Sequence, residues 1–258
     1  MHHTVIKIDN AVVSYREDIA LRGISLEVKD GEFVGIIGPN GAGKTTLLTL
    51  INGLGRLVQG NVYVLGHRIT PGNGHFLRKK VGYISQAQNM DPRMPMSVSE
   101  VALIGRYGKL GLFKRPTAYD EKVTNDILEL VGMTQLARRP IGHLSGGEQQ
   151  RVAIARCLAQ EPEIFLLDEP TASLDWRSKT EILELVKMIH ESRHLTTLIV
   201  THDLSSLPLT CGRLIMMKDG LIRGDDSPDK LLTDDNLSLL FDLPVAEVRQ
   251  RRQTGVLA

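Results

Sequence analysis

Nine consecutive residues near the start of the chain have the types and spacing of a phosphate-binding loop. The run Gly38-Pro39-Asn40-Gly41-Ala42-Gly43-Lys44-Thr45-Thr46 fits the pattern G-x-x-x-x-G-K-S/T. Glycines let the backbone turn its N–H groups toward an anion, and the helix expected next adds the positive end of its dipole. We expect Lys44 to reach the β- and γ-phosphates and Thr45 to hold Mg²⁺. The run therefore predicts a nucleoside triphosphate site rather than an ordinary glycine-rich turn.

A second helix start, far along the chain, has similar chemistry. The run Leu144-Ser145-Gly146-Gly147-Glu148 precedes a helix whose inward residues are expected to be Val152, Ala155, Leu158 and Ala159. Ser145 is the expected N-cap, and Glu148 completes a capping box. A well-capped helix with flexible glycines is one interpretation. The other is an anion site made by bare N–H groups, a hydroxyl and a helix dipole, so that one phosphate is held from two sides.

Strands and helices must position these motifs. Apolar runs predict buried strands over residues 32–37, 164–168 and 196–201, the first leading through the phosphate loop into a helix at 47–51. An opening antiparallel sheet is expected from the runs 5–8, 11–15 and 24–28, and the run 61–65 predicts another strand. A further strand is expected at 81–85, and a closing hairpin turns at Lys218-Asp219-Gly220. The core is therefore expected to be α/β.

The segment between Gln86 and about Pro140 has a different sequence pattern, which predicts helices and no strands. Ser97 and Glu100 have the spacing of a capping box, which predicts a helix start. A second helix over 118–131 places on one face Val123, Ile127, Leu130 and Val131. A later amphipathic helix over 181–189 has in register Ile182, Leu185, Val186 and Ile189. These patterns predict a helical subdomain inserted into the α/β core, and the tail from Ser227 is expected to form a helix and a docking segment.

Composition limits the remaining possibilities. The chain has 258 residues, a formal net charge of +1 and 42% hydrophobic residues, as is usual for a globular protein. There is no basic excess of the kind that binds nucleic acid. Cys157 and Cys211 are far apart, so a disulfide framework is not expected. We also see no run that could span a membrane and no signal peptide, so any membrane role must go through a partner.

Taken together, the motifs resemble those of the ATP-binding cassette (ABC) ATPases over nearly the whole chain. The ordered set comprises the Walker A loop at 38–46, the Q-loop glutamine Gln86, the signature at 144–148, the Walker B strand at 164–168 with Glu169, the D-loop Ser173-Leu174-Asp175 and the switch histidine His202. Tyr15 lies where that family has an adenine-stacking aromatic; on pattern alone it would be a strand aromatic that covers the core. One departure is Glu148, since the signature usually reads Leu-Ser-Gly-Gly-Gln. Glutamate can close the capping box equally well, so no loss of activity is implied.

The resemblance implies a P-loop NTPase (RecA-like) core with an N-terminal antiparallel β subdomain and an inserted α-helical signature subdomain. A single ABC ATPase domain over 1–258 is expected, with the core at about 1–86 and 160–226, the helical subdomain at about 87–159 and the C-terminal tail at about 227–258.

Roles for individual residues follow from phosphoryl-transfer chemistry within that resemblance. Asp168 would hold Mg²⁺ with the aid of Thr45 and Gln86, and Glu169 would act as the general base for the attacking water. Lys44 would neutralise the phosphates, and His202 would contact the γ-phosphate. The alternative for a carboxylate at a strand end is a helix cap. The signature of one copy, Ser145 to Glu148, would complete the site of another copy, so a homodimer that sandwiches two ATP molecules is implied.

The segment 97–116 is similar to bacterial importer ATPases for metals and metal chelates. Gly105-Arg106-Tyr107-Gly108 looks most like the manganese/zinc/iron branch, whereas siderophore and haem importers often have Gly-Arg-Tyr-Pro. This implies separate permease subunits, an extracytoplasmic binding protein and a place at the cytoplasmic face of the bacterial inner membrane. The alternatives are a soluble single-cassette ATPase, such as those of iron–sulfur cluster assembly, and a siderophore or haem importer ATPase. The transported ion is left open.

Two further expectations concern particular segments. We expect part of a groove for a permease helix to be lined by Met90, Met94, Met96 and Tyr107, since methionine suits adaptable contacts; the alternative is that they pack on the core. Pro208 follows the switch histidine where the family usually has a helix, and Gly212 replaces an aspartate before Arg213. Proline inside a helix costs about 3 kcal/mol, so we expect a late helix start near Leu207 or a short, broken helix.

Overall fold

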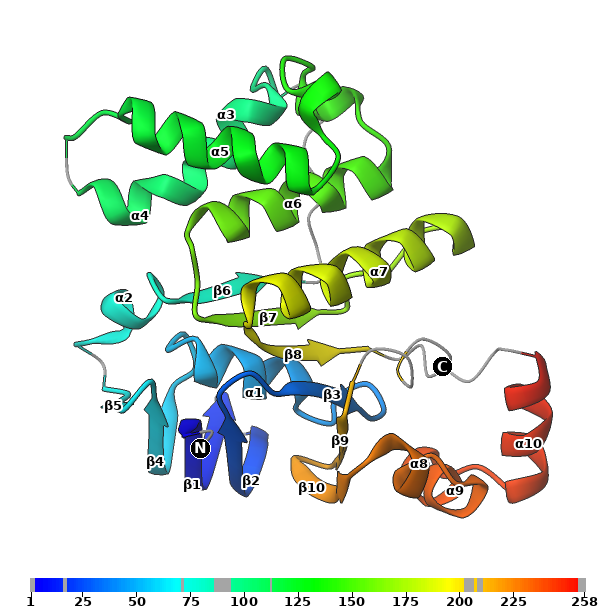
Figure 1. The fold of residues 1–258 in the computed structure, drawn as a ribbon. Coiled ribbons are helices and arrows are strands. Elements are labelled where there is room, and N and C mark those ends of the chain that lie inside the picture. The colour runs from blue at the N-terminus through cyan, green and yellow to red at the C-terminus, as the bar shows by residue number, and fades with distance from the viewer. Residues whose placement is uncertain are drawn as a thin grey trace.

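An antiparallel sheet begins the fold. The computed structural model describes residues 3–15, 18–70, 72–85, 94–111, 113–201, 207 and 211–254. The four strands of this sheet lie in the order β2-β1-β4-β5, in the blue and cyan part of Figure 1. They are β1 (Thr4–Tyr15), β2 (Asp18–Lys29), β4 (Leu57–Val64) and β5 (His67–Arg68). The predicted antiparallel sheet is confirmed, although the runs 5–8 and 11–15 form one strand with register shifts rather than two strands.

A second sheet of six strands forms the centre of the molecule, in the order β10-β9-β3-β8-β7-β6. Its members are β3 (Phe33–Ile37), β6 (Val81–Ile84), β7 (Ile164–Asp168), β8 (Thr196–Val200), β9 (Arg213–Lys218) and β10 (Leu221–Asp226). The strands from β9 to β6 run parallel, and β10 returns antiparallel to β9 as the predicted hairpin. Every residue of β3, β7 and β8 is buried, as is typical of parallel strands with both faces covered.

Alternate residues of β3 belong to two separate hydrophobic cores. Phe33 and Ile37 pack with the helices α6 (Gly146–Ala159) and α7 (Trp176–Arg193), whereas Val34 and Ile36 pack with α1 (Lys44–Ile51) and the antiparallel sheet. In Figure 1, α7 and α1 lie on opposite faces of the central sheet. The predicted inner face of α7 is confirmed. Because the carboxyl ends of parallel strands share one edge, the loops that follow β3 and β7 meet there.

The described part of the segment between β6 and β7 contains helices, which form the upper layer of Figure 1. They are α3 (Val98–Leu103), α4 (Tyr107–Leu110), α5 (Ala118–Leu130) and α6, with 3₁₀ turns η1 (Ile104–Arg106), η2 (Thr134–Leu136) and η3 (Ile141–His143). Ser97 and Glu100 form the predicted capping box. The inner face of α5 includes Ile127 and Val131, as predicted, but Val123 and Leu130 are only half-buried. Asp120 and Thr124 are buried instead, because each has a hydrogen-bond partner that a hydrophobic pattern cannot reveal.

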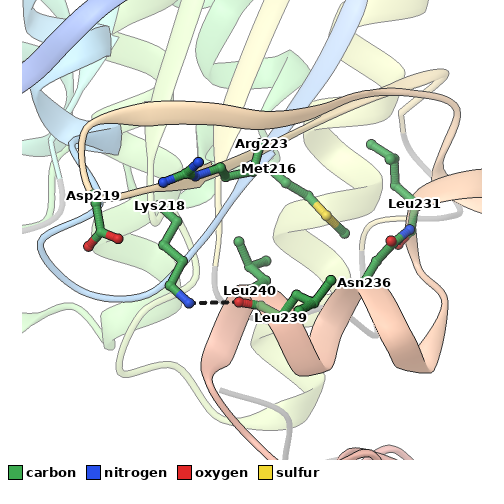
Figure 2. Close-up of a pocket in the computed structure, with 8 residues that line it drawn as sticks. All are labelled: Met216, Lys218, Asp219, Arg223, Leu231, Asn236, Leu239 and Leu240. Carbon is green, nitrogen blue, oxygen red and sulfur yellow. Dashed lines mark hydrogen bonds between the residues drawn. The ribbon is translucent and has the colours of Figure 1, made fainter.

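The C-terminal tail contains three helices where one was expected: α8 (Pro228–Leu231), α9 (Asp234–Phe241) and α10 (Val245–Thr254). The helices α8 and α9 dock against the closing hairpin, and α10 packs on α9. Lys218 at the end of β9 donates through Nζ to the Leu239 carbonyl at 2.6 Å, as Figure 2 shows, and pairs with Asp242 at 2.6 Å. A short helix, α2 (Gly74–Leu77), precedes β6. Within the described ranges, no helix has both the length and the apolar character needed to cross a bilayer.

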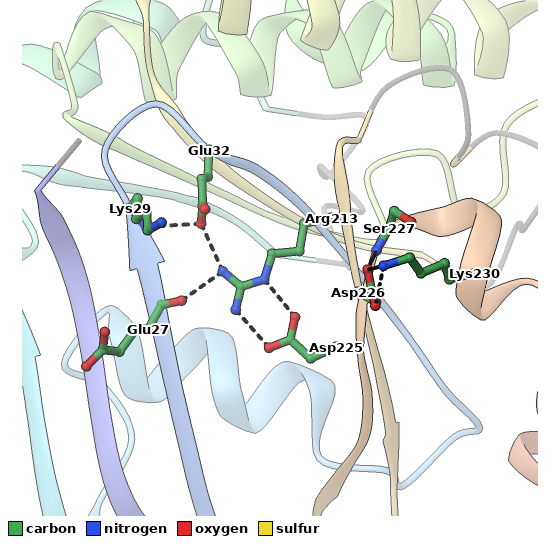
Figure 3. Close-up of polar contacts among 8 residues, drawn as sticks. All are labelled: Glu27, Lys29, Glu32, Arg213, Asp225, Asp226, Ser227 and Lys230. Atoms are coloured by element: carbon green, nitrogen blue, oxygen red, sulfur yellow. Dashed lines mark hydrogen bonds and ion pairs between the residues drawn. The ribbon is translucent and has the colours of Figure 1, made fainter. Parts of the chain in front are cut away.

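Arg213 joins the two sheets beside the start of β3. Its guanidinium donates to both Asp225 carboxylate oxygens at 2.7 Å, to Glu32 at 3.0 Å and to the Glu27 carbonyl at 2.9 Å (Figure 3). These contacts come from β2, β10 and the residue before β3. Arginine suits such a junction because its donors have a fixed fork geometry.

Candidate functional site

The loop between β3 and α1 contains the phosphate-binding pattern. Gly43 has φ 95° and is the N-cap of α1, but it offers no side-chain acceptor to the first N–H groups of the helix. A Cβ at Gly43 would lie 2.6 Å from the Ala20 carbonyl oxygen, so no larger residue fits. A Cβ at Gly38 would overlap the Met217 carbonyl. The loop is therefore held against neighbouring backbone in a glycine-dependent shape of the kind that suits an anion site.

Lys44 places its ammonium inside the curve of this loop. Its Nζ donates to the Gly38 carbonyl at 2.7 Å and to the Pro39 carbonyl at 3.0 Å. The side chain is buried, and burial lowers the pKa of Lys44, whereas the nearby carboxylates of Glu169 and Asp168 oppose that shift. A phosphate entering the loop would therefore meet a cation that is already in place.

Asp168 ends β7 at the same edge of the sheet and is 1% exposed. Its Oδ2 accepts a hydrogen bond from the Tyr83 hydroxyl at 3.2 Å. Burial raises the pKa of Asp168, and the hydroxyls of Thr45 and Tyr83 oppose this effect. The sequence-based reasoning did not identify Tyr83 as part of the site. The only indication in the sequence was that Tyr83 has a polar hydroxyl in an otherwise apolar strand.

The oxygens near the loop fit Mg²⁺ carried with a nucleotide. Asp168 Oδ1 is buried and has no hydrogen-bond partner among the described residues, so it can accept a cation or its water. Among those residues, no group of three or more His, Cys, Asp or Glu side chains could hold a metal by itself. Mg²⁺ is usually bound by one or two carboxylates together with substrate phosphates. The donor set of Asp168 and the Thr45 hydroxyl matches that arrangement.

Glu169 faces the phosphate loop although it is more than 120 residues away in sequence. It lies in the left-handed region, with φ 49°, and its N–H donates to the Val200 carbonyl at 2.9 Å. Its side chain lines a pocket of about 320 Å³ with Ala20 and the loop residues Asn40 to Thr46. The next helix, α7, has Asp175 as its N-cap, so Glu169 does not cap it. The structure thus brings a carboxylate beside the expected phosphate position.

A larger pocket of about 390 Å³ lies between the β9–β10 turn and α9 (Figure 2). Its lining mixes Met216 and leucines with Lys218, Asp219 and Arg223. Lys218 already has two partners there. Of these two pockets, the smaller one contains the glycine-rich loop, Lys44 and Glu169, so it is the candidate phosphate site.

The segment from Ser145 to Glu148 begins α6 with the predicted capping box. Ser145 Oγ accepts from the Glu148 N–H at 3.3 Å, and Glu148 Oε2 accepts from the Ser145 N–H at 2.7 Å and the Ser145 hydroxyl at 2.8 Å. Backbone hydrogen bonding lowers the pKa of Glu148, so the residue is anionic near neutral pH. These four residues do not line the pocket around the phosphate loop. The capping box is the one predicted from the sequence, and this helix start is separate from the pocket.

Of the predicted residues Ser173, Leu174 and Asp175, Leu174 lies beside this second helix start. A Cβ at Gly146 would lie 3.2 Å from Leu174, and one at Gly147 would lie 3.0 Å from the Ser178 hydroxyl oxygen. Asp175 accepts from the Ser178 N–H at 3.0 Å and so fixes the start of α7. The start of α6 and the start of α7 are therefore in contact through Leu174 and Ser178.

Other predicted residues lie away from this pocket or outside the described residues. Tyr15 ends β1 and is 49% exposed. In the helical segment, Met94 and Tyr107 are exposed, but Met96 packs against the core, which supports the alternative for that residue. Four residues of the sequence-based predictions lie outside the described ranges, namely Gln86, Met90, His202 and Pro208.

Comparisons with known proteins agree with this geometry. Residues 21–172 match the family model described as ABC transporter. The manganese transport system ATP-binding protein MntB of Listeria monocytogenes is 36% identical over 93% of this chain and 98% of its own length. The chain is also 36% identical to an uncharacterized ABC transporter ATP-binding protein, YvrA of Bacillus subtilis, but spans only 52% of that longer protein.

Two solved structures are also similar. One is an inward-facing transporter described as an ABC transporter of the metal-chelate type, with a TM-score of 0.81, 27% identity and coverage of 93% of this chain and 90% of that one. The other is the dimeric, post-hydrolysis structure of an ATP-binding cassette bound to ADP and Pi, with a TM-score of 0.74, 31% identity and coverage of 86% and 98%.

Proposed function

Because the chain belongs to the ABC transporter family, we propose that it is the ATP-hydrolysing subunit of an importer for a metal ion or metal chelate. The observation that carries the proposal is one pocket in which Lys44, Thr45 and Glu169 come together. The manganese-transport relative and the metal-chelate type transporter support the substrate class. In this proposal the chain works at the cytoplasmic face of the bacterial inner membrane, on separate permease subunits that receive substrate from an extracytoplasmic binding protein.

In this proposal, each group in the pocket has a role in ATP hydrolysis. The loop N–H groups and Lys44 bind the phosphates and stabilise the charge on the transferred group. Glu169 orients a water for attack and accepts its proton at a carboxylate oxygen. In the same proposal, Gln86 and His202 sense the γ-phosphate. Tyr15 is the surface on which adenine stacks.

Mg²⁺ would be held by Thr45 and Asp168, with Gln86 as a further ligand. When bound, it would neutralise part of the phosphate charge. Tyr83 has a positioning role here, because its hydroxyl bonds one Asp168 oxygen while the other has no hydrogen-bond partner among the described residues.

A second copy of the chain supplies the remaining contacts in this proposal. Ser145, Gly146 and Gly147 lie at a helix start that does not line the pocket of their own chain, and in this proposal they bind the ATP held by the other copy. The dimeric structure of a related cassette with ADP and Pi supports a site shared between two copies. Ser173, Leu174 and Asp175 would connect the two sites, because Leu174 lies against the signature residue Gly146.

Permease subunits would bind the helical layer near Met94 and Tyr107. Both side chains are exposed, at 38% and 51%, although each carries a large apolar surface. Cysteines placed at these two positions are expected to cross-link to the permease in an assembled complex. A cysteine at the core-packed Met96 is the matched control. Cross-links from neither exposed position would count against this surface.

Transport itself is tested by reconstituting the chain in liposomes with the integral membrane protein that co-purifies with it. We expect ATP-dependent uptake of Mn²⁺, Zn²⁺, Fe²⁺ or a chelate of one of them. Uptake should be lost in Glu169→Gln, which retains the fold and removes the proposed base. A co-purified partner without membrane spans, or ATP hydrolysis without uptake of any of these substrates, would refute the importer assignment.

A further inference from the structure

The segment Gly105-Arg106-Tyr107-Gly108 has a physical role that its resemblance to importer ATPases does not explain. Arg106 ends η1 and is 3% exposed, an unusual position for a guanidinium. Its neighbour Tyr107 begins α4 and is 51% exposed. Two consecutive residues thus point to opposite environments, one into the protein and one to the surface.

Three hydrogen-bond acceptors and one aromatic ring surround the Arg106 guanidinium. Nε donates to Asp120 of α5 at 2.9 Å. Nη1 donates to the Ala159 carbonyl at the end of α6 at 2.8 Å, and to Glu161 at 2.6 Å. The Tyr119 ring lies over the guanidinium, 5.5 Å from its carbon to the ring centre. Arg106 therefore ties η1 to α5, to the end of α6 and to the connection into β7.

Asp120 and Glu161 are themselves fixed. Asp120 Oδ2 accepts from the Thr117 N–H at 2.9 Å and from the Thr117 hydroxyl at 2.7 Å. The backbone hydrogen bond from Thr117 is the main reason that the pKa of Asp120 falls to about 2, so the carboxylate remains charged. Glu161 also pairs with Lys109 at 2.7 Å. The cluster is thus a closed network of charges with satisfied hydrogen bonds.

Gly105 brings this network close to α6. A Cβ at Gly105 would overlap the Arg156 carbonyl and would lie 2.9 Å from the Ala159 Cβ. The backbone of η1 therefore rests directly on the last turn of α6. At its other end, the same helix begins with Ser145 and Gly146.

A buried ion cluster is a weak means of stabilising a fold, since desolvation offsets much of its attraction. It does fix geometry, because two carboxylates and a carbonyl must meet one rigid guanidinium. We propose that Arg106 is a positioning residue, which joins the exposed Tyr107 surface to α6 so that contact with a permease helix moves the signature end of that helix. This inference rests on the proposed function, in which that surface meets the permease.

The test compares ATP hydrolysis by the isolated chain with hydrolysis by the chain assembled with its permease subunits in nanodiscs. The variant Arg106→Met/Asp120→Asn removes both buried charges together, so that no lone charge remains in the interior. We expect its basal kcat and its KM for ATP to stay within about twofold of wild type. Stimulation by the permease should fall at least about fivefold, the lower range of an allosteric coupling.

Two further variants separate positioning from general stability. Tyr107→Ala should lose the same stimulation, and adding it to Arg106→Met/Asp120→Asn should cause no further loss, because both act on one connection. Lys122→Met/Asp126→Asn removes an exposed ion pair of α5 and should change nothing. The inference would be overturned if Arg106→Met/Asp120→Asn lowered basal and permease-stimulated hydrolysis equally. It would also be overturned if adding Tyr107→Ala to that variant caused a further loss of stimulation.

Failure of the proposed function gives a different result. Wild-type hydrolysis that the permease does not change at all would overturn the importer assignment and this inference with it. Stimulation that is normal in wild type and survives in Arg106→Met/Asp120→Asn would overturn only the role of Arg106.

Discussion

Replacing Asp168 by asparagine should make the nucleotide-free chain more stable while removing its response to Mg²⁺. Asp168 is 1% exposed, and one of its two oxygens has no hydrogen-bond partner among the described residues. An unsatisfied buried acceptor costs about 1–3 kcal/mol, and more when it is charged. We take about 1 kcal/mol for the gain, because asparagine retains one carbonyl oxygen and the attraction of Lys44 is lost. For a chain of this size, the melting temperature should rise by about 2–4 °C at neutral pH.

The pH dependence of this gain has a defined sign. Because burial raises the folded-state pKa of Asp168, its contribution to stability is fully present only below the unfolded value of about 3.9. That contribution is lost as the pH rises through the folded-state pKa. The difference between Asp168→Asn and wild type should therefore widen from acid to neutral pH. Asp175→Asn is the matched control, since hydrogen bonds from Ser178 lower the pKa of Asp175 and no gain is expected.

Thermal unfolding followed by circular dichroism, with and without nucleotide, measures both effects. Wild type should gain about 2.7 kcal/mol at a ligand concentration of 100 times Kd, and part of this gain should require Mg²⁺. In Asp168→Asn, adding Mg²⁺ to ATP should give no further gain. A variant that melts below wild type without nucleotide, or that retains the full Mg²⁺ effect, would refute this account of Asp168.

Three other predictions concern residues of the loop, the signature and the core. Lys44→Ala should weaken ATP binding by about 1.5–3 kcal/mol, the worth of a hydrogen bond to a charged group, and calorimetry that finds unchanged affinity would contradict the loop assignment. Glu148→Gln keeps the capping box but removes a negative charge 2.8 Å from the Ser145 hydroxyl, so the KM for ATP should fall; a higher KM would count against an anion site there. Burial raises the thiol pKa of Cys157 to about 12 and that of Cys211 to about 11, so neither should react with a maleimide until the chain unfolds, and rapid labelling would disprove this.

The elements around the phosphate loop could be predicted from sequence because their signals are local. An unbroken apolar run gives β7, and a serine three residues before a glutamate gives the start of α6. The meeting of Glu169 with the loop was also predictable, since the carboxyl ends of parallel strands share an edge.

Contacts that depend on tertiary packing could not be predicted. Tyr83 reaches Asp168 only because β6 lies next to β7, and a tyrosine in a strand gives no sign of its partner. Asp120 is buried although a hydrophobic pattern places it outside, because Arg106 comes from 14 residues away to meet it. The three short helices of the tail could not be predicted for the same reason, since tertiary contacts such as that of Lys218 with Leu239 hold this segment.

The central claim is that two copies of this chain close around ATP and that Glu169 then drives hydrolysis. The direct measurement is light scattering of Glu169→Gln with Mg-ATP, together with its turnover. We predict a mass of two chains of 28.5 kDa, dissociation to single chains when ATP is removed, and turnover reduced by about 10²–10⁴. A variant that binds ATP but stays at the mass of one chain, or that retains near-normal turnover, would contradict the claim.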